Sequence, residues 1–376
     1  MEPPDAFHYF DSPISYDQFE PYMQTNTPCI FGSWISADWP ATQNWVSAGG
    51  TPNFQYLREN YGSFQASFTR FNERLQEFDC HQQKISEFID YWESLPCQPS
   101  NQLTTKFPPN ESLSSLPHYL KDWHFAKTTD PSSVYRVPDL FSDDWLNRYF
   151  SSRVDVSDDY IFSYFGPAGT FTPFHCDVLR SYSWSINLCG KKQWLFLYPG
   201  EEARLSTPCT CNVYQEVLEK GLRHVVVEQG PGEGVFVPSG WHHQVLNCTD
   251  TISVNHNWAN AHCAARMWGY LREELLLVER EIADCRELME GQEEWREQCQ
   301  LLLRANVGMG FREFLQFLLV NLKGMTGDGF GDVVGKMGVV LDSSVDVGEI
   351  AVSNGKSFLY SVDDVMELIA DVLLVF

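Results

Sequence analysis

Short apolar and aromatic runs fill the middle of the chain, and they constrain the fold more than any other feature of the sequence. Between about residues 155 and 258, glycine, proline and asparagine interrupt these runs every few residues. We expect strands at 160–165, 184–188, 193–197, 224–228, 234–237, 243–246 and 252–256. So many short strands in roughly 100 residues predict a mainly β core, a sandwich or barrel, rather than alternating β and α units.

Helical patterns flank this β-rich segment. The pattern turns helical from about 54 to 96, and apolar residues recur after position 258, with one stripe made of Met267, Leu271, Leu275, Val278 and Ile282. The organisation we expect is an N-terminal arm at 1–30, a mostly helical part at 31–154, the β core at 155–260 and a helical region at 261–376. The C-terminal stripes fit either packing within one chain or a homodimer, and the sequence leaves both open.

Charge and cysteine content indicate where the protein works. The 376 residues carry a formal net charge of −24, which argues against sequence-independent binding of nucleic acid because phosphates need Lys and Arg. The 11 cysteines show no disulfide-scaffold spacing and are typical of a reducing compartment. The first residues lack a secretory pattern, and no apolar run is long enough to span a membrane. We expect a soluble cytoplasmic protein, with the nucleus as a second location.

A His-x-Asp pair lies in the β-rich segment. His175 and Asp177 are two residues apart, so on a regular strand both side chains leave the same face. An imidazole and a carboxylate at one point make two thirds of the two-histidine, one-carboxylate triad that binds ferrous iron. By itself this pair is a weak signal, because a hydrogen-bonded surface pair has the same spacing.

A third ligand is available downstream, after the expected strand at 234–237. His242 and His243 follow a Pro-Ser-Gly-Trp turn, and only one of them can point inward easily because successive strand residues face opposite sides. We predict His243 as the third metal ligand, with His242 as the alternative.

Lys192 enters an apolar, aromatic strand, where a charge is costly to bury without a partner. No acidic residue lies within the run from Cys189 to Phe196. We therefore predict that Lys192 binds an anionic cosubstrate. Because the lysine ammonium is a flexible point charge, a single terminal carboxylate is a suitable partner.

These residues resemble the JmjC-domain oxygenases, which use Fe(II) and 2-oxoglutarate. The resemblance covers about residues 115–260 and rests on segments at 119–124, 142–147, 166–169, 173–177, 180–185, 189–192, 238–244 and 252–258. A chance match to all of these family segments in the same order is not credible.

The resemblance implies a fold and a set of roles. The fold is a double-stranded β-helix of the cupin or jelly-roll type, with His175, Asp177 and His243 on iron. Lys192 and the hydroxyl of Thr172 would hold the distal carboxylate of 2-oxoglutarate, and Asn255 would line the same pocket.

The resemblance also implies a reaction. With Fe(II), 2-oxoglutarate and O2, the chain would hydroxylate a protein substrate, the eukaryotic translation termination factor, at C-4 of a lysine. Two alternatives stay open: a JmjC-type lysine or arginine demethylase, and a catalytically inactive cupin-like scaffold.

Overall fold

The computed structural model describes residues 7–74, 77–96, 107–108, 110–153, 160–206, 212–326 and 362–374, which form two compact units. The first unit draws its residues from 1–142, 160–177 and 182–257, and the second from 143–159, 178–181 and 258–376.

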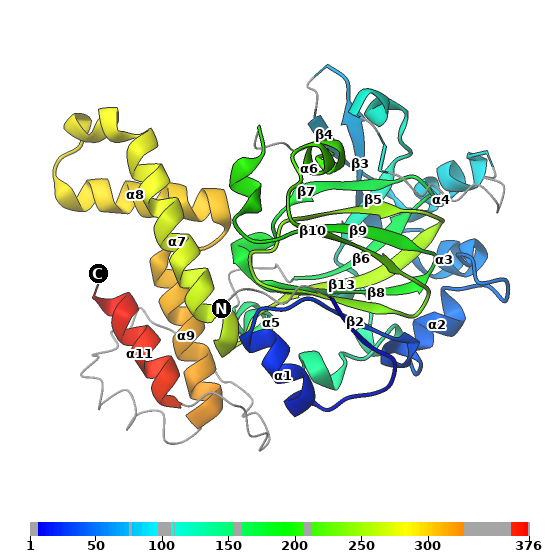
Figure 1. Ribbon diagram of the computed structural model, residues 1–376, viewed down its shortest axis with the longest axis horizontal. Helices are drawn as coiled ribbons and strands as arrows, with labels where there is room; N and C mark the ends of the chain where they lie inside the picture. Colours follow the sequence, from blue (N-terminus) through cyan, green and yellow to red (C-terminus); the bar gives the residue numbers. More distant parts are fainter. Residues whose placement is uncertain are drawn as a thin grey trace. The chain divides into compact units, whose positions relative to one another are not determined.

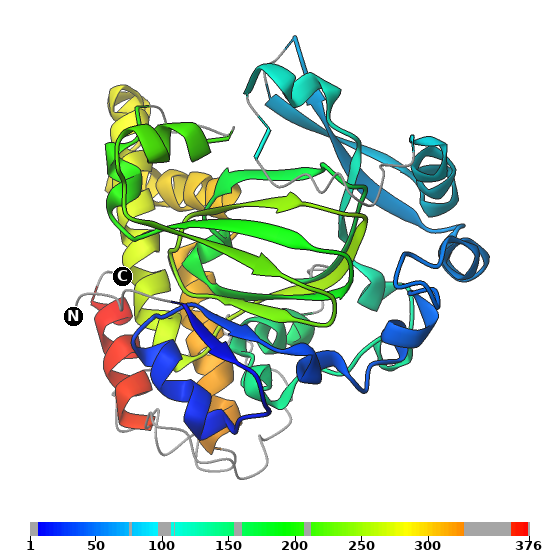
Figure 2. The same cartoon turned by 45° about the vertical axis from the view of Figure 1, so that its right-hand side comes forward.

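Two β-sheets build the first unit (Figures 1 and 2). The larger sheet has nine strands, in the order β1 (His8–Phe10), β2 (Cys29–Phe31), β11 (Gly234–Val237), β8 (Tyr182–Cys189), β13 (Thr251–Trp258), β6 (Ile161–Gly166), β5 (Tyr119–Trp123), β3 (Gln65–Asn72) and β4 (Glu77–Lys84). The smaller sheet has four, in the order β10 (His224–Gln229), β9 (Lys192–Leu197), β12 (His243–Asn247) and β7 (Phe171–His175). All seven expected strands are confirmed, and with them the mainly β core.

Strand β9 has apolar side chains on both of its faces, so its sequence shows no alternation of apolar and polar residues. Leu195 and Leu197 pack into one apolar cluster, whereas Trp194 and Phe196 pack into another, so the strand is buried on both faces. A strand buried on both faces reads as a continuous apolar run. Lys192 shares the parity of Trp194 and Phe196, and this alternation turns its side chain to their face.

The expectation of helix from 54 to 96 was wrong in its middle. Helices α3 (Phe54–Tyr61) and α4 (Ile85–Ser94) form the ends of this stretch, but β3 and β4 lie between them as an antiparallel pair. Buried Ala66 and Phe68 are spaced by two, and Phe71 pairs across the strands with Phe78. A spacing of two is the period of a strand. Antiparallel pairing of β3 with β5 joins this pair of strands to the rest of the larger sheet.

The N-terminal segment packs on the first unit as strand and helix. Strand β2 extends the larger sheet through antiparallel pairing with β11, and β1 pairs with β2 in parallel. The other helices of this unit are α1 (Tyr16–Gln24), α2 (Pro40–Asn44) and α6 (Tyr214–Glu219).

The second unit is helical. Among the described residues, its α-helices are α5 (Trp145–Ser152), α7 (Ala261–Glu281), α8 (Gln292–Val307), α9 (Phe311–Thr326) and α11 (Val362–Leu373) (Figure 1). Val278 of the expected stripe packs against Trp295 and Cys299 of α8, so the stripe serves packing within the chain. Dimerisation through these helices stays a prediction. Among the described residues, no helix combines the length and apolarity needed to cross a membrane.

Candidate active site

His175, Asp177 and His243 come together at the end of the smaller sheet. His175 is the last residue of β7 and His243 the first of β12, and these two residues face each other in the antiparallel register. Asp177 follows the end of β7 instead of continuing it. One possible ligand atom from each side chain lies within 4.8 Å of the others, and the two imidazole centroids are 4.3 Å apart.

Backbone carbonyls orient both imidazoles. His175 Nδ1 lies 2.8 Å from the Pro173 carbonyl oxygen, and His243 Nδ1 lies 3.0 Å from that of Trp241. Because a carbonyl oxygen only accepts hydrogen bonds, Nδ1 of each ring carries the proton. The lone pair of Nε2 is then available to a metal. Asp177 Oδ2 accepts from the Ser183 hydroxyl at 2.7 Å, and its Oδ1 lies 4.0 Å from His175 Nε2. Two imidazoles and one carboxylate, each oriented by a hydrogen bond, fit the ligand set of non-haem Fe(II).

The protonation state of His175 suits this role. Burial and the positive character of His243 and Lys121 lower the pKa of His175 well below its usual range, and Asp177 opposes the shift only in part. A neutral imidazole is the form that coordinates a metal.

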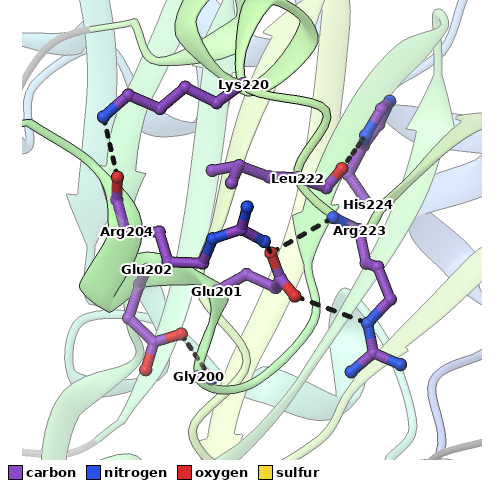
Figure 3. A network of polar contacts seen from close by, with 8 residues as sticks. All are labelled: Gly200, Glu201, Glu202, Arg204, Lys220, Leu222, Arg223 and His224. Carbon is purple, nitrogen blue, oxygen red and sulfur yellow. Dashed lines mark hydrogen bonds and ion pairs between the residues drawn. The ribbon is translucent and has the colours of Figure 1, made fainter.

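His242 points to a different environment. Its ring stacks on Phe174 at 5.4 Å, and its Nδ1 lies 4.0 Å from Glu202. Glu202 also accepts from the Gly200 backbone N–H at 2.7 Å, within the polar network of Figure 3. In that network Glu201 accepts hydrogen bonds from Arg204 and Arg223 and so secures the loop after β9. Of the two histidines, His243 is the one that the structure brings to His175 and Asp177.

Lys192 lies inside the core, only 2% exposed. Its Nζ donates to the hydroxyls of Ser253 at 2.7 Å and Ser185 at 3.3 Å, and no described carboxylate pairs with it. Burial, with a smaller effect of the charge on Lys121, lowers the pKa of Lys192 to about 7. A buried ammonium with only neutral partners fits an anion that enters from outside the chain.

A tight turn places Lys192. Gly190 has a φ of 78°, and a Cβ there would collide with the Asp250 carbonyl. Asp250 itself accepts from Trp92 Nε1 at 3.1 Å and from the Ala168 backbone N–H at 2.9 Å. The connection from β8 to β9 therefore needs glycine, both for its left-handed backbone and for the close approach.

One pocket contains all six residues to which the sequence assigned a role. Its lining comprises Tyr119, Lys121, Phe162, Tyr164, Thr172, His175, Asp177, Ser183, Trp184, Ser185, Lys192, Trp194, His243, Val245, Asn255, His256 and Asn257. Asn255 Nδ2 donates to the Ser253 hydroxyl at 3.1 Å, which joins it to Lys192. The binding roles of these six residues stay predictions.

Sequence reasoning missed several residues of this pocket. Ser185 and Ser253 are the hydroxyl partners of Lys192, and the alternation of β8 and β13 could have pointed to them. Lys121 lies over the rings of Tyr119 and Tyr164, 5.8 and 5.5 Å from their centroids. Regular strand alternation does not predict the orientation of Lys121, because the pairing of β5 with β6 changes register between Leu120 and Trp123.

The fold and the donor set are those of a known class of oxygenase. Residues 162–258 match the family described as JmjC domain, hydroxylase, which has the double-stranded β-helix of the cupins. The chain is 39% identical over 320 residues to the chicken 2-oxoglutarate and iron-dependent oxygenase JMJD4, covering 81% of this chain and 71% of that protein. Its identity to human JMJD4 is 36%, over 84% of this chain and 74% of the human protein.

A plant protein named for a different activity is also similar. The chain is 35% identical to the Arabidopsis thaliana arginine-specific demethylase JMJ20, over 81% of this chain and 67% of that protein. This chain belongs to the JmjC family of Fe(II)- and 2-oxoglutarate-dependent oxygenases, and within it to the group that contains the JMJD4 proteins. Iron, 2-oxoglutarate and O2 are accordingly its cofactor and cosubstrates.

Proposed function

We propose that this chain is a protein lysyl hydroxylase that modifies C-4 of a lysine in the eukaryotic translation termination factor. Similarity to the JMJD4 proteins supports the proposal. The structural observation that supports catalysis is the grouping of His175, Asp177 and His243, which could hold a metal ion. Because that substrate acts in translation, the proposal places the enzyme in the cytoplasm.

In this proposal the pocket divides its work between two ends. His175, Asp177 and His243 hold the iron, Lys192 and Thr172 hold the distal carboxylate of 2-oxoglutarate, and Asn255 lines the same pocket. With both bound, the iron supplies the activation of O2 that converts a C–H bond to an alcohol while 2-oxoglutarate becomes succinate and CO2.

The chain's own residues orient and shield the reacting groups. Lys192 meets the carboxylate where no described protein carboxylate competes for it, so the cosubstrate gains a buried ion pair. The aromatic faces of Phe162 and Tyr164 provide apolar walls for the aliphatic part of a side chain. Trp184 also lines the pocket.

Demethylation is the second candidate, favoured by the likeness to JMJ20. The same site would hydroxylate an N-methyl group, and the product would lose formaldehyde. An inactive scaffold is disfavoured, because three oriented metal ligands and a buried lysine without a carboxylate partner among the described residues are costly to keep without a ligand.

Mass spectrometry separates the candidates. The purified chain is incubated with Fe(II), 2-oxoglutarate and air, once with the termination factor and once with methylated arginine and lysine peptides. Gain of one oxygen on a lysine of the termination factor supports the proposal, and loss of a methylene from a methylated peptide supports the alternative. His175→Ala is the control that should lose either activity, and succinate formation in that variant would contradict the metal assignment.

A further inference from the structure

Asn26, in the N-terminal segment, forms hydrogen bonds to the turn that leads to His243. Asn26 donates from Nδ2 to the Ser239 carbonyl oxygen at 2.8 Å, and its Oδ1 accepts from the Ser239 backbone N–H at 3.0 Å. Its own backbone carbonyl accepts from Trp241 Nε1 at 3.0 Å. Three hydrogen bonds therefore join residue 26 to a turn more than 200 positions away in the sequence.

The backbone of Asn26 is shaped for this contact. Its φ of 57° lies in the left-handed region, where asparagine is one of the few non-glycine residues that occur regularly. Asn26 lies between α1 and β2, and its backbone N–H donates to the Met23 carbonyl at 3.2 Å. The side-chain amide then pairs with the Ser239 backbone as a neighbouring strand would.

The turn that Asn26 contacts is the one that orients His243. Trp241 is 2% exposed in the apolar cluster with Val237 and Val245, and its carbonyl oxygen binds His243 Nδ1 at 3.0 Å. A shift of Trp241 would move this carbonyl and rotate the imidazole. Gly240 lies at the same turn with a φ of 76°, and the bonds from Asn26 add to the turn's own hydrogen bond from the Trp241 backbone N–H to the Pro238 carbonyl at 3.4 Å.

We propose that Asn26 is a positioning residue for the metal site: it fixes the 238–241 turn so that the His243 imidazole presents Nε2 toward His175 and Asp177. The inference rests on the proposed role of His243 as a metal ligand. It assigns the N-terminal segment a part in metal binding, through the hydrogen bonds of Asn26 to Ser239 and Trp241, which hold the turn whose Trp241 carbonyl binds His243. Partners beyond the ligands commonly tune metal affinity in this way.

Cobalt binding tests the proposal without turnover. Co(II) is titrated into the metal-free protein in the absence of air, and the visible absorption band of the bound ion gives the affinity. Asn26→Gly keeps the left-handed backbone and the carbonyl that binds Trp241, but loses both bonds to Ser239. We expect about tenfold weaker Co(II) binding, the lower end of the effect of such outer partners. Trp241→Phe, which keeps an aromatic ring in the cluster but removes the donor to Asn26, should weaken binding similarly.

Tyr9→Phe is the matched control. It removes another hydrogen bond between the N-terminal segment and the core, from the Tyr9 hydroxyl to Glu233 at 2.6 Å, which lies before the start of β11 whereas the turn follows its end. Its Co(II) affinity should equal that of the unmodified chain. Unchanged affinity in Asn26→Gly, or an equal loss in Tyr9→Phe, would overturn the proposal.

His243→Ala and urea unfolding keep the outcomes distinct. Co(II) binding by His243→Ala at the original affinity would contradict the ligand assignment itself, not the role of Asn26 alone. Unfolding curves recorded for each variant show whether the protein remains folded at the titration conditions. If Asn26→Gly does not fold, the comparison of Trp241→Phe with Tyr9→Phe decides the proposal by the same criterion.

Discussion

Replacing Lys192 by methionine should stabilise the protein in the absence of 2-oxoglutarate while it destroys cosubstrate binding. The buried Nζ has only the hydroxyls of Ser185 and Ser253 as hydrogen-bond partners, and its pKa falls to about 7. Methionine has a similar length and no charge, so it removes the cost of burying an ammonium.

The size of the effect follows from the shift of the Lys192 pKa. A fall from 10.5 to about 7 corresponds to about 5 kcal/mol of unfolding free energy lost while the group is charged in both states, below pH 7. Losing the donor to Ser185 and Ser253 costs the variant about 1–3 kcal/mol. Lys192→Met should therefore raise the unfolding free energy by about 2 kcal/mol near pH 7.

The sign of the pH dependence is also determined. Between pH 7 and 10.5 the unfolded chain holds a proton on Lys192 that the folded chain does not, so the penalty shrinks as pH rises. The change in unfolding free energy caused by Lys192→Met should drop by about 2 kcal/mol between pH 7 and pH 9. Urea unfolding at the two pH values, without 2-oxoglutarate, measures it.

Lys191→Met is the matched control for this experiment. Lys191 precedes Lys192 but donates to Glu228 at 2.6 Å at the surface, so its replacement should change stability little at either pH. By calorimetry, 2-oxoglutarate should bind Lys192→Met at least about 100-fold more weakly, because its carboxylate loses a buried ionic partner. A variant less stable than the unmodified chain at pH 7, or a difference that does not change with pH, would refute the reasoning.

Three further predictions concern the metal site and its supports. His243→Ala should lose Fe(II) binding in anaerobic titrations whereas His242→Ala should keep it, and the reverse result would exchange their assignments. Ser183→Ala should weaken metal affinity about tenfold by freeing Asp177, with an unchanged affinity showing that this hydrogen bond has no orienting role. Gly190→Ala should lower the unfolding free energy by more than about 1 kcal/mol in urea, because alanine is strained at a φ of 78°; equal stability would show that the turn adapts.

Much of the core could be predicted because its signals are local. Each expected strand is a short apolar run between turn residues, and burial of such a run does not depend on its exact partner. His175, Asp177, His243 and Lys192 do line one pocket, although Asp177 lies beyond the end of β7 and strand alternation therefore does not explain its placement.

The hairpin of β3 and β4 shows where local signals fail. Its strands carry polar residues such as Gln65 and Lys84 on an edge of the sheet, and its flanks are true helices. The alternation of Ala66 and Phe68 is short, and its meaning depends on β5, which lies beyond α4 in the sequence. Propensity over such a stretch is overridden by the sheet that receives it.

The sequence alone predicted the candidate ligand residues, the strands of the core and the family to which the chain belongs. Only the tertiary structure placed His243 rather than His242 beside His175 and Asp177, paired Lys192 with Ser253 and brought Asn26 to the turn before His243. The physical reason is one of range. Strand alternation and turn chemistry act between neighbouring residues, whereas hydrogen bonds between residues separated by 61 and 213 positions exist only after the sheets have paired.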